Sequence, residues 1–470
     1  MAIKQVQVGV GHLLLGMYVS RIDRPWSETP FALQGFYIRS PREINQLKTY
    51  CSHVFVDIEK GRAPLGKTAS PVVLDQTKKT LYKPLARSTA GVGSKPVKKT
   101  KEQATASPLI VRKGVYETSV SLPQESVKAK KIVGRLKGSL TLVIKQMGRG
   151  KTVDYGRLKD SVGDMVDSVL RCPDAFIWLV RLREQDAHSY DHSLRSALWA
   201  VQFARYVGMP KDEIAVLCMG TLLKDVGKAR LSNRLLRKEN RSDAEENEYR
   251  KHVSYGVDIL RQTQKIEPRV MSVVRYQAER NDGSGYPEGL VGGKIPLLAR
   301  ISGIASTYDS ICYPREASEP LAPSRAVSML YDMRDKQFSD DLVVNFIQSI
   351  GLYPTGTLVE LTTGDIGIVT EQHPKSRLTP KVAVLGRGGA ELTDAVIVVD
   401  LKDDEKTRQV LGSKHGEIGG LIERAAIARD LEPGGYDVDL SKIAHLVITQ
   451  ELGGSKGFLS GWRERLHLGS

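Results

Sequence analysis

The sequence predicts an α+β multidomain protein, mainly an all-α helical domain, with a small β-rich N-terminal domain and a small β-rich C-terminal appendage. Three observations support this prediction. Apolar residues recur at three- and four-residue spacing through much of residues 125–350, alternate within residues 6–19, and gather in short β-rich runs between residues 353 and 401. A chain of 470 residues is also too long for one ordinary domain.

Residues 1–62 are predicted to form the N-terminal β-rich domain. Gly16 and Pro25 interrupt its alternating pattern, and the run CSHVFVDI at residues 51–58 is typical of a buried strand. The apolar N-terminus alternates as a strand does and lacks a small-residue cleavage pattern, so we expect no signal peptide. The chain contains no run of eighteen apolar residues, so we also expect no membrane span.

The basic charge is concentrated in one segment. The net charge is +15, and residues 63–137 contain 16 Lys and Arg but only 4 Asp and Glu. Residues 63–122 are rich in Pro, Ser, Thr, Lys and Gly without sustained periodicity, so we predict a disordered linker that is dispensable for folding. Nucleic-acid binding is the alternative interpretation, but the segment lacks interleaved aromatic residues and any nucleic-acid-binding motif. We therefore favour a solvated linker.

The remaining boundaries follow from changes in pattern. Residues 123–352 are predicted to be helical, residues 353–403 form the β-rich appendage, and residues 404–470 form a tail with a helix in GEIGGLIERAAIARDL, residues 416–431. The four cysteines are widely separated and form no CxxC pair, which argues against a zinc ribbon or redox motif. This cysteine usage fits a reduced cytoplasmic protein.

Two segments contain the motifs that indicate chemistry. They are LCMGTLLKDVGKARLSNRLLRKE at residues 217–239 and RYQAERNDGSGYPEGLVGGKIPLLARISGIASTYDS at residues 275–310. Together they resemble the HD-GYP domain, a helical HD-superfamily fold that cleaves cyclic di-GMP (cyclic diguanylate). The DVGK turn, the ER-x-DGSGYP loop and the later ARI and YD motifs occur at the separations typical of that family. The resemblance covers roughly residues 168–351. The segments LLLGMYV, DRPWSETPFALQGFYI and HVFVDIEKGR resemble the small domain that often precedes HD-GYP domains.

The resemblance implies a cluster of two or three divalent iron or manganese ions, each held by His, Asp or Glu side chains. His192, Asp225 and His252 match three of seven expected ligand positions. The other four positions are occupied by Lys224, Gln277, Ala278 and Ser306. An ammonium group and a methyl group cannot bind a cation, and Lys224 adds a fixed positive charge. We therefore expect no resident metal cofactor, and an ion pair between Lys224 and Asp225 in its place.

Each retained residue also has a purely structural interpretation. His192 could be a hydrogen-bonded helix histidine, His252 could orient a helix, and Asp225 could be retained for structure. His188 lies one turn before His192, where some family members have an additional ligand, but we favour an ordinary surface histidine.

The residues that the resemblance assigns to a phosphate ligand are better retained. Lys228 follows the DVG turn, and the loop at residues 282–287 contains Gly285, Tyr286 and Pro287. A glycine-rich backbone can approach an anion closely, although the same glycines could simply form a tight turn. Arg315 matches a basic position that contacts ligand phosphate, and a second such position is occupied by Ser318.

These observations favour a non-catalytic cyclic-di-GMP signalling protein that acts either as a receptor or as a protein-interaction scaffold. The family's glycine-rich loop is associated with diguanylate cyclase domains, which makes such a domain or another signalling protein the expected partner. The alternative is an active cyclic-di-GMP phosphodiesterase with an altered metal site. The identities of residues 224, 277, 278 and 306 argue against that alternative.

Overall fold

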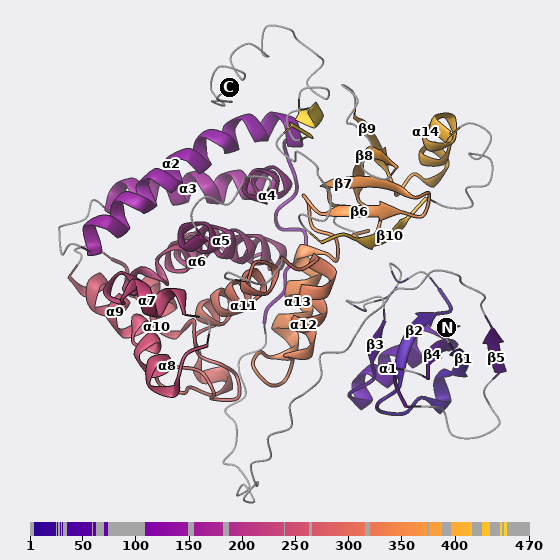
Figure 1. The fold of residues 1–470 in the computed structure, drawn as a ribbon, viewed down its shortest axis with the longest axis horizontal. Coiled ribbons are helices and arrows are strands. Elements are labelled where there is room, and N and C mark those ends of the chain that lie inside the picture. Colours follow the sequence, from indigo (N-terminus) through magenta and orange to yellow (C-terminus); the bar gives the residue numbers. More distant parts are fainter. Residues whose placement is uncertain are drawn as a thin grey trace, which may run out of the picture. The chain divides into compact units, whose positions relative to one another are not determined.

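The computed structural model describes most of the chain. The described residues are 4–24, 26, 29, 31, 35–58, 60–62, 70–73, 109–148, 155–181, 188–238, 240–262, 266–314, 320–373, 376–387, 396–415, 425–432, 442–443 and 446–448. The chain divides into two compact units, Met1–Glu102 and Gln103–Ser470 (Figure 1).

The first unit is an antiparallel sheet with one α-helix, and its strand order is β3-β2-β4-β1-β5. Its elements are β1 (Lys4–Gly9), the 3-10 helix η1 (Val10–His12), β2 (Tyr18–Ile22), β3 (Phe36–Tyr37), α1 (Pro41–Tyr50), β4 (His53–Asp57) and β5 (Ser70–Val73). Val6 on β1 lies opposite Val56 on β4, and both side chains are buried. The alternating pattern and the predicted buried strand at residues 51–58 are therefore confirmed.

Helix α1 illustrates how local sequence sets an element boundary. Ser40 accepts a hydrogen bond from the Glu43 amide, and the Glu43 carboxylate accepts one from the Ser40 amide, so the pair forms a capping box. Pro41 occupies the first turn, where its missing N–H costs nothing. Leu47 is fully buried, so α1 contributes an apolar side chain to the core of its unit.

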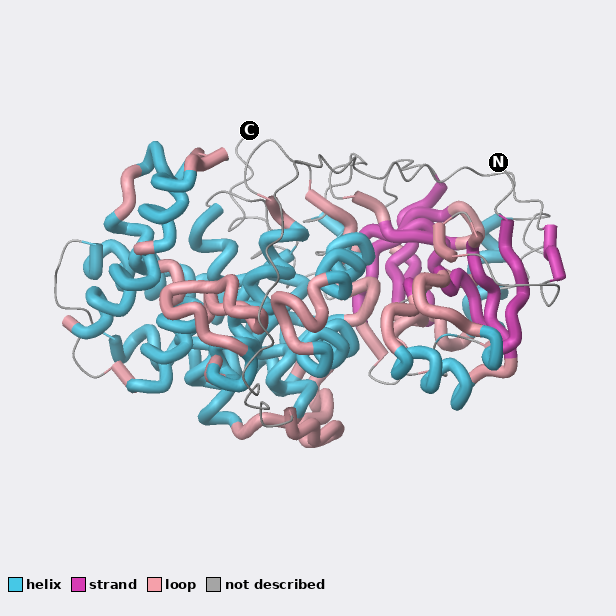
Figure 2. Tube along the Cα trace, turned by 90° about the horizontal axis from the view of Figure 1, so that it is seen from below, coloured by secondary structure: helices cyan, strands magenta, loops and turns pink. Residues whose placement is uncertain are grey.

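The second unit is mainly helical. Its helices are α2 (Leu122–Gly148), α3 (Tyr155–Arg171), α4 (Pro173–Arg181), α5 (His188–Val207), α6 (Lys211–Leu223), η3 (Val226–Arg230), α7 (Asn233–Arg237), α8 (Asp243–Arg250), α9 (His252–Arg261), α10 (Pro268–Tyr276), η4 (Gly292–Lys294), α11 (Leu297–Cys312), α12 (Pro323–Asp332) and α13 (Asp340–Ile350). Helices, cyan in Figure 2, make up most of this unit. Helix α5 packs against α6, α11 and α13. A buried chain of aromatic rings joins α5, α11 and α13 through Trp199, Phe203, Tyr308 and Phe346.

A five-stranded antiparallel sheet follows the helices, in the order β10-β6-β7-β8-β9. The C-terminal β unit, as we call it below, comprises β6 (Leu358–Leu361), β7 (Asp365–Glu371), β8 (Lys381–Arg387), β9 (Ile397–Asp400), α14 (Asp404–His415) and β10 (Ile427–Asp430). Its buried face shares one core with α4, in which Ala175 and Trp178 join Ile366 and Ile368.

Two expectations from the sequence require correction. Strand β5 falls inside the predicted disordered linker and pairs with β1. Residues 109–121 are also placed against helices: the Arg112 amide donates to the Val207 carbonyl, and the Ser119 amide donates to the Arg171 carbonyl. In these stretches, strand pairing and hydrogen bonds to helices give ordered structure where the composition predicted disorder. The rest of the predicted linker, residues 74–108, lies outside the described residues.

The second correction concerns the C-terminal tail. We predicted a helix over residues 416–431, but residues 427–430 form strand β10, which pairs with β6 at the sheet edge. An unpaired sheet edge favours such strand addition over local helical periodicity. Residues 416–424 lie outside the described residues. The appendage therefore extends beyond residue 403, and α14 lies within it.

Two further expectations can be compared with the structure. All four cysteines are free and buried. In the part of the chain that the structure describes, no helix has both the length and the apolar character needed to cross a membrane.

Candidate functional site

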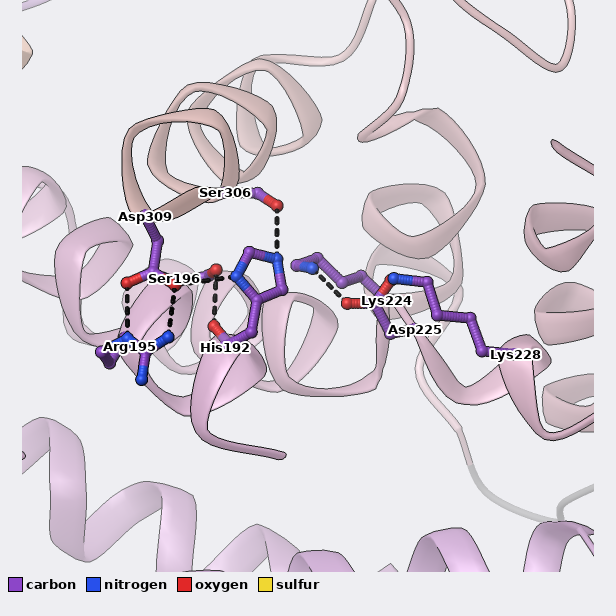
Figure 3. Close-up of polar contacts among 8 residues, drawn as sticks. All are labelled: His192, Arg195, Ser196, Lys224, Asp225, Lys228, Ser306 and Asp309. Atoms are coloured by element: carbon purple, nitrogen blue, oxygen red, sulfur yellow. Dashed lines mark hydrogen bonds and ion pairs between the residues drawn. The ribbon is translucent and has the colours of Figure 1, made fainter. Parts of the chain in front are cut away.

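The candidate site lies where α5, the turn between α6 and η3, α9 and α11 meet. Close packing at Gly227 brings η3 against α9, because a Cβ atom there would lie 1.9 Å from the His252 carbonyl oxygen. Only glycine allows that approach, which places the DVGK turn next to the start of α9. This packing brings His252 close to Asp225. The predicted residues His192, Lys224, Asp225, Lys228 and Ser306 lie together beside it (Figure 3).

Asp225 is held between two lysines. Lys224 Nζ donates a hydrogen bond to Asp225 Oδ2, and Lys228 Nζ lies 2.7 Å from Asp225 Oδ1. The Lys224 side chain is 2% exposed, whereas Asp225 and Lys228 are 11% and 13% exposed. Both carboxylate oxygens therefore face an ammonium group. The predicted pairing of Lys224 with Asp225 is present in the structure.

His192 is held from both sides. Its Nδ1 atom lies 2.7 Å from Asp309 Oδ2, and its Nε2 atom lies 3.2 Å from Ser306 Oγ. An ionised Asp309 can only accept, so Nδ1 carries the hydrogen, and in the neutral ring Nε2 accepts from the Ser306 hydroxyl. This arrangement aims Nε2 toward the cluster, as a carboxylate behind a metal-binding histidine would do.

Sequence reasoning missed two residues that support this histidine. Asp309 is fully buried, and Arg195 Nε donates to its Oδ1 atom at 2.8 Å while Arg195 Nη2 donates to Oδ2 at 3.2 Å. Arg195 lies three residues after His192, and Asp309 lies three residues after Ser306. Helical spacing at three residues was the signal that could have identified both.

His252 is the second histidine that faces Asp225. Its Nδ1 atom donates to the Tyr249 carbonyl at 2.7 Å, which leaves Nε2 facing Asp225 Oδ1 at 4.0 Å. The His252 ring also contacts the rings of Tyr249 and Tyr286, with centroid separations of 5.0 Å and 6.1 Å. His252 therefore connects the charged cluster to the glycine-rich loop at residues 282–287.

Burial and charge keep both histidines neutral. Burial, reinforced by the nearby Lys224 ammonium, lowers the pKa of His192 to about 4 despite the opposing Asp309 carboxylate. Burial, reinforced by Lys228, lowers the pKa of His252 to about 4 as well. Burial also lowers the pKa of Lys224, and the adjacent Asp225 carboxylate opposes that shift. With Lys224 protonated, the charged groups of this cluster are the cations Lys224, Lys228 and Arg195 and the carboxylates Asp225 and Asp309.

The carboxylates remain ionised in spite of burial. Burial opposes ionisation of Asp225, but Lys224 and Lys228 outweigh it and hold its pKa well below the ordinary value. Burial likewise opposes ionisation of Asp309, and Arg195 followed by the His192 hydrogen bond overcomes it, so its pKa is also lowered. With three cations and two carboxylates, the cluster carries a net positive charge, which attracts anions and repels metal ions.

The remaining ligand positions lie beside the loop. Gln277 and Ala278 are both buried at the end of α10, and the Ala278 carbonyl accepts a hydrogen bond from the Tyr286 amide at 3.3 Å. The Ala278 carbonyl thus anchors the glycine-rich loop. Arg315 and Ser318 lie outside the described residues, as does the side chain of His188, although α5 begins at that residue.

Glu279 is a further residue that sequence reasoning missed. Its side chain is buried, and its two oxygens accept hydrogen bonds from the backbone amides of Glu288 at 2.7 Å and Leu290 at 2.9 Å. The backbone also packs closely at Gly285, where a Cβ atom would lie 2.3 Å from the Arg280 amide nitrogen. Both features hold Tyr286 and Pro287 in a defined loop. Glu279 opens the ER-x-DGSGYP motif of the sequence, but that motif alone did not indicate a role for its side chain.

The residues present do not fit a multinuclear metal centre. Both oxygens of Asp225 face ammonium groups, the Ser306 hydroxyl beside His192 is a neutral group, and Lys224 Nζ lies within the cluster itself. In the described part of the chain, no group of three or more His, Cys, Asp or Glu side chains is arranged to hold a metal ion. The donor set is suited to an anion rather than to divalent cations.

Comparisons with known proteins agree with the two segments of resemblance. Residues 5–158 match a domain of unknown function (DUF3391), and residues 179–342 match the HD domain. The cyclic di-GMP phosphodiesterase PA4108 of Pseudomonas aeruginosa is 27% identical over 414 residues, which cover 87% of this chain and 92% of that protein.

Two further similarities are more limited. The 3'3'-cGAMP-specific phosphodiesterase 2 of Vibrio cholerae is 33% identical over 168 residues, covering 35% of this chain and 31% of that protein. Among solved structures, the HDG"Y"P protein Bd1817 of Bdellovibrio bacteriovorus covers 73% of this chain and 98% of its own, with 13% identity and a TM-score of 0.41.

Proposed function

We propose that this chain, which carries an HD domain and is homologous to cyclic di-GMP phosphodiesterases, binds a cyclic dinucleotide without cleaving it and serves as a signalling receptor. The observation that carries the proposal is the buried Lys224 ammonium, which donates to Asp225 inside the cluster. Phosphodiester hydrolysis in this family depends on metal ions that activate water, and a fixed cation at this position opposes their entry.

The same charge supports binding of a phosphodiester. Arg195, Lys224 and Lys228 exceed the carboxylates Asp225 and Asp309 by one positive charge, so an anion is attracted to this site. Lys228 is the more exposed of the two lysines, which makes it the first contact for a phosphate. Cyclic di-GMP is the primary candidate, and the similarity to a 3'3'-cGAMP-specific enzyme makes that nucleotide the appropriate comparison.

Isothermal titration of the full chain with cyclic di-GMP, with and without manganese, tests the receptor function. We expect binding that is unchanged by manganese or by a chelator, because the lysines replace the ions. Binding that requires manganese would contradict the proposal and favour a phosphodiesterase with an altered metal site. If neither cyclic di-GMP nor 3'3'-cGAMP binds, the receptor function fails and a scaffold role remains, with a diguanylate cyclase domain as the first partner to test.

Elemental analysis of the same preparation gives a second readout. We expect no stoichiometric iron or manganese, because four of seven ligand positions hold Lys224, Gln277, Ala278 and Ser306. Two metal ions per chain would contradict the proposal.

A further inference from the structure

A continuous series of contacts runs from the candidate site to the C-terminal β unit. It begins at His192, whose Nδ1 atom pairs with Asp309, and continues to Arg195, which donates to both oxygens of Asp309. The Arg195 guanidinium lies over the Tyr313 ring, 4.2 Å from its centroid. Arg181 Nε in turn donates to the Tyr313 hydroxyl at 3.3 Å. Tyr313 is therefore shared by the two arginines.

Arg181 attaches this series to the segment that leads into β6. Its Nη1 atom donates to the Thr355 carbonyl at 2.9 Å, to Thr357 Oγ1 at 3.0 Å and to the Pro354 carbonyl at 3.3 Å. The hydrogen bonds that the structure describes for Arg181 thus all end on uncharged oxygens. A partly buried cation held in this way depends on the geometry of those oxygens, because no carboxylate among these contacts compensates for a displacement.

Helix α4 carries a second attachment at its other end. Asp174 accepts hydrogen bonds from Thr355 Oγ1 at 2.5 Å and from the Gln372 amide at 3.4 Å. Between Asp174 and Arg181, the buried face of α4 packs into the core of the β unit through Ala175 and Trp178. Helix α4 therefore makes both apolar and hydrogen-bonded contacts with the C-terminal β unit. Arg181, at the end of α4, links these contacts to the site through Tyr313.

We infer that occupancy of the site by a phosphodiester is coupled to the attachment of the C-terminal β unit through Tyr313. This inference rests on the proposed receptor function and assigns the β unit as its output element. An anion that engages Lys224 and Lys228 restrains the groups that surround the His192 ring, and each further member of the series touches the next directly. Restraint at one end lowers the frequency of local opening at the other.

Hydrogen exchange of the full chain tests the coupling. With saturating cyclic di-GMP, we expect amide exchange in β6 and β7 to slow about fivefold or more, the lower range of typical coupling between sites. Tyr313→Phe removes the hydroxyl that Arg181 contacts but keeps the ring beneath Arg195. This variant is expected to bind cyclic di-GMP and to show less than about a twofold change in β6 and β7.

Tyr206→Phe is the matched control. It removes a tyrosine hydroxyl that donates to Gln348 Oε1 at 3.0 Å, between α5 and α13, outside the series. The ligand-dependent protection of β6 and β7 should persist in this variant. Unchanged exchange in the ligand-bound wild type, or protection that survives Tyr313→Phe, overturns the coupling.

Titration of the same samples separates the two proposals. If cyclic di-GMP does not bind, the receptor function fails, and the coupling is then decided without ligand by His192→Ala. That variant removes the site end of the series, so exchange in β6 and β7 should rise while circular dichroism remains that of the wild type. Unchanged exchange in a folded His192→Ala protein would overturn the coupling by itself.

Discussion

Lys224 and Asp225 form a buried ion pair within the site, and Lys228 contacts the second oxygen of the same carboxylate. A buried pair of this kind costs desolvation energy, and removing one partner leaves an uncompensated charge. Lys224 adds to the effect of burial in lowering the pKa of His192, which gives the pair a measurable consequence.

Replacing Lys224 with an uncharged residue should raise the pKa of His192. Burial and the Lys224 ammonium together lower that pKa to about 4, so Lys224→Met should raise it toward the ordinary value of 6.5. The measurement is a pH titration of the His192 ring signals by NMR with labelled histidine. Lys238→Met, which removes an exposed lysine paired with Glu245, should leave the His192 pKa unchanged. An unshifted pKa in Lys224→Met would contradict the electrostatic account.

The two buried histidines should also make stability depend on pH. Their folded pKa values, about 4, lie below the unfolded value of 6.5, so the unfolded chain binds more protons between these limits. Their contribution is fully present above pH 6.5 and is lost as pH falls toward 4. By pH 5 the loss should be on the order of 2 kcal/mol for each histidine, measured by urea unfolding at pH 7 and pH 5.

Asp174 should change the stability of the protein with pH in the direction opposite to that of the two histidines. Burial raises its pKa to about 6, above the ordinary 3.8, so the folded protein takes up a proton there as pH falls. This uptake stabilises the folded state on acidification by about 1 kcal/mol between pH 7 and pH 5. Asp174→Asn removes it, and the decrease in unfolding free energy over that pH range should grow by the same amount. If the unfolding free energy of Asp174→Asn fell by less than that of the wild type between pH 7 and pH 5, protonation of Asp174 would not be the stabilising event.

The glycine-rich loop should tolerate no side chain at Gly285. A Cβ atom there would meet the Arg280 amide nitrogen at 2.3 Å and Glu279 Cα at 2.4 Å, both backbone atoms that cannot move aside cheaply. Gly285→Ala should therefore lower the free energy of unfolding by about 1–3 kcal/mol, measured by chemical denaturation. Gly134→Ala, in α2 with open space around its Cβ position, should stabilise by roughly 0.5–1 kcal/mol instead.

Lys228 should contribute directly to ligand affinity. Lys228→Ala is expected to weaken cyclic di-GMP binding by about 1.5–3 kcal/mol, the scale of a charge-assisted hydrogen bond. Calorimetric titration measures this difference. Lys211→Ala, which removes an exposed lysine paired with Asp167, controls for net charge and should change the affinity by less than about 0.5 kcal/mol. Equal losses of cyclic di-GMP affinity in the two variants would indicate that the ligand responds only to the net charge of the protein and not to a contact with Lys228.

The fold was predictable where periodicity was strong. The helical domain and both β-rich regions follow from patterns of apolar residues, because those patterns bury one face of each element. Strand β10 was not predictable, since residues 427–430 gain strand structure from the free edge of β6. The same applies to β5, which pairs with β1 within a segment of linker-like composition.

The site was predictable through its motif positions but not through its supporting contacts. The resemblance to the HD-GYP family implied that His192, Lys224 and Asp225 lie in one site, and the ion pair expected between Lys224 and Asp225 is present. The role of Arg195 was missed, because a lone Arg in a helical pattern resembles an ordinary solvated residue. Glu279 lay within the loop motif, but the motif did not show which groups its carboxylate contacts. Their roles depend on tertiary contacts with Asp309 and with the amides of residues 288 and 290, which local sequence does not specify.

Product analysis by chromatography tests the central claim most directly. The full chain is incubated with cyclic di-GMP and either manganese or ferrous ion, and linear dinucleotide and GMP are quantified. We predict no product above a protein-free control, because Lys224 and Ser306 occupy positions where ionisable ligands would hold the metal ions that activate water. Turnover by the wild-type chain that disappears in His192→Ala or Asp225→Ala would contradict the non-catalytic account.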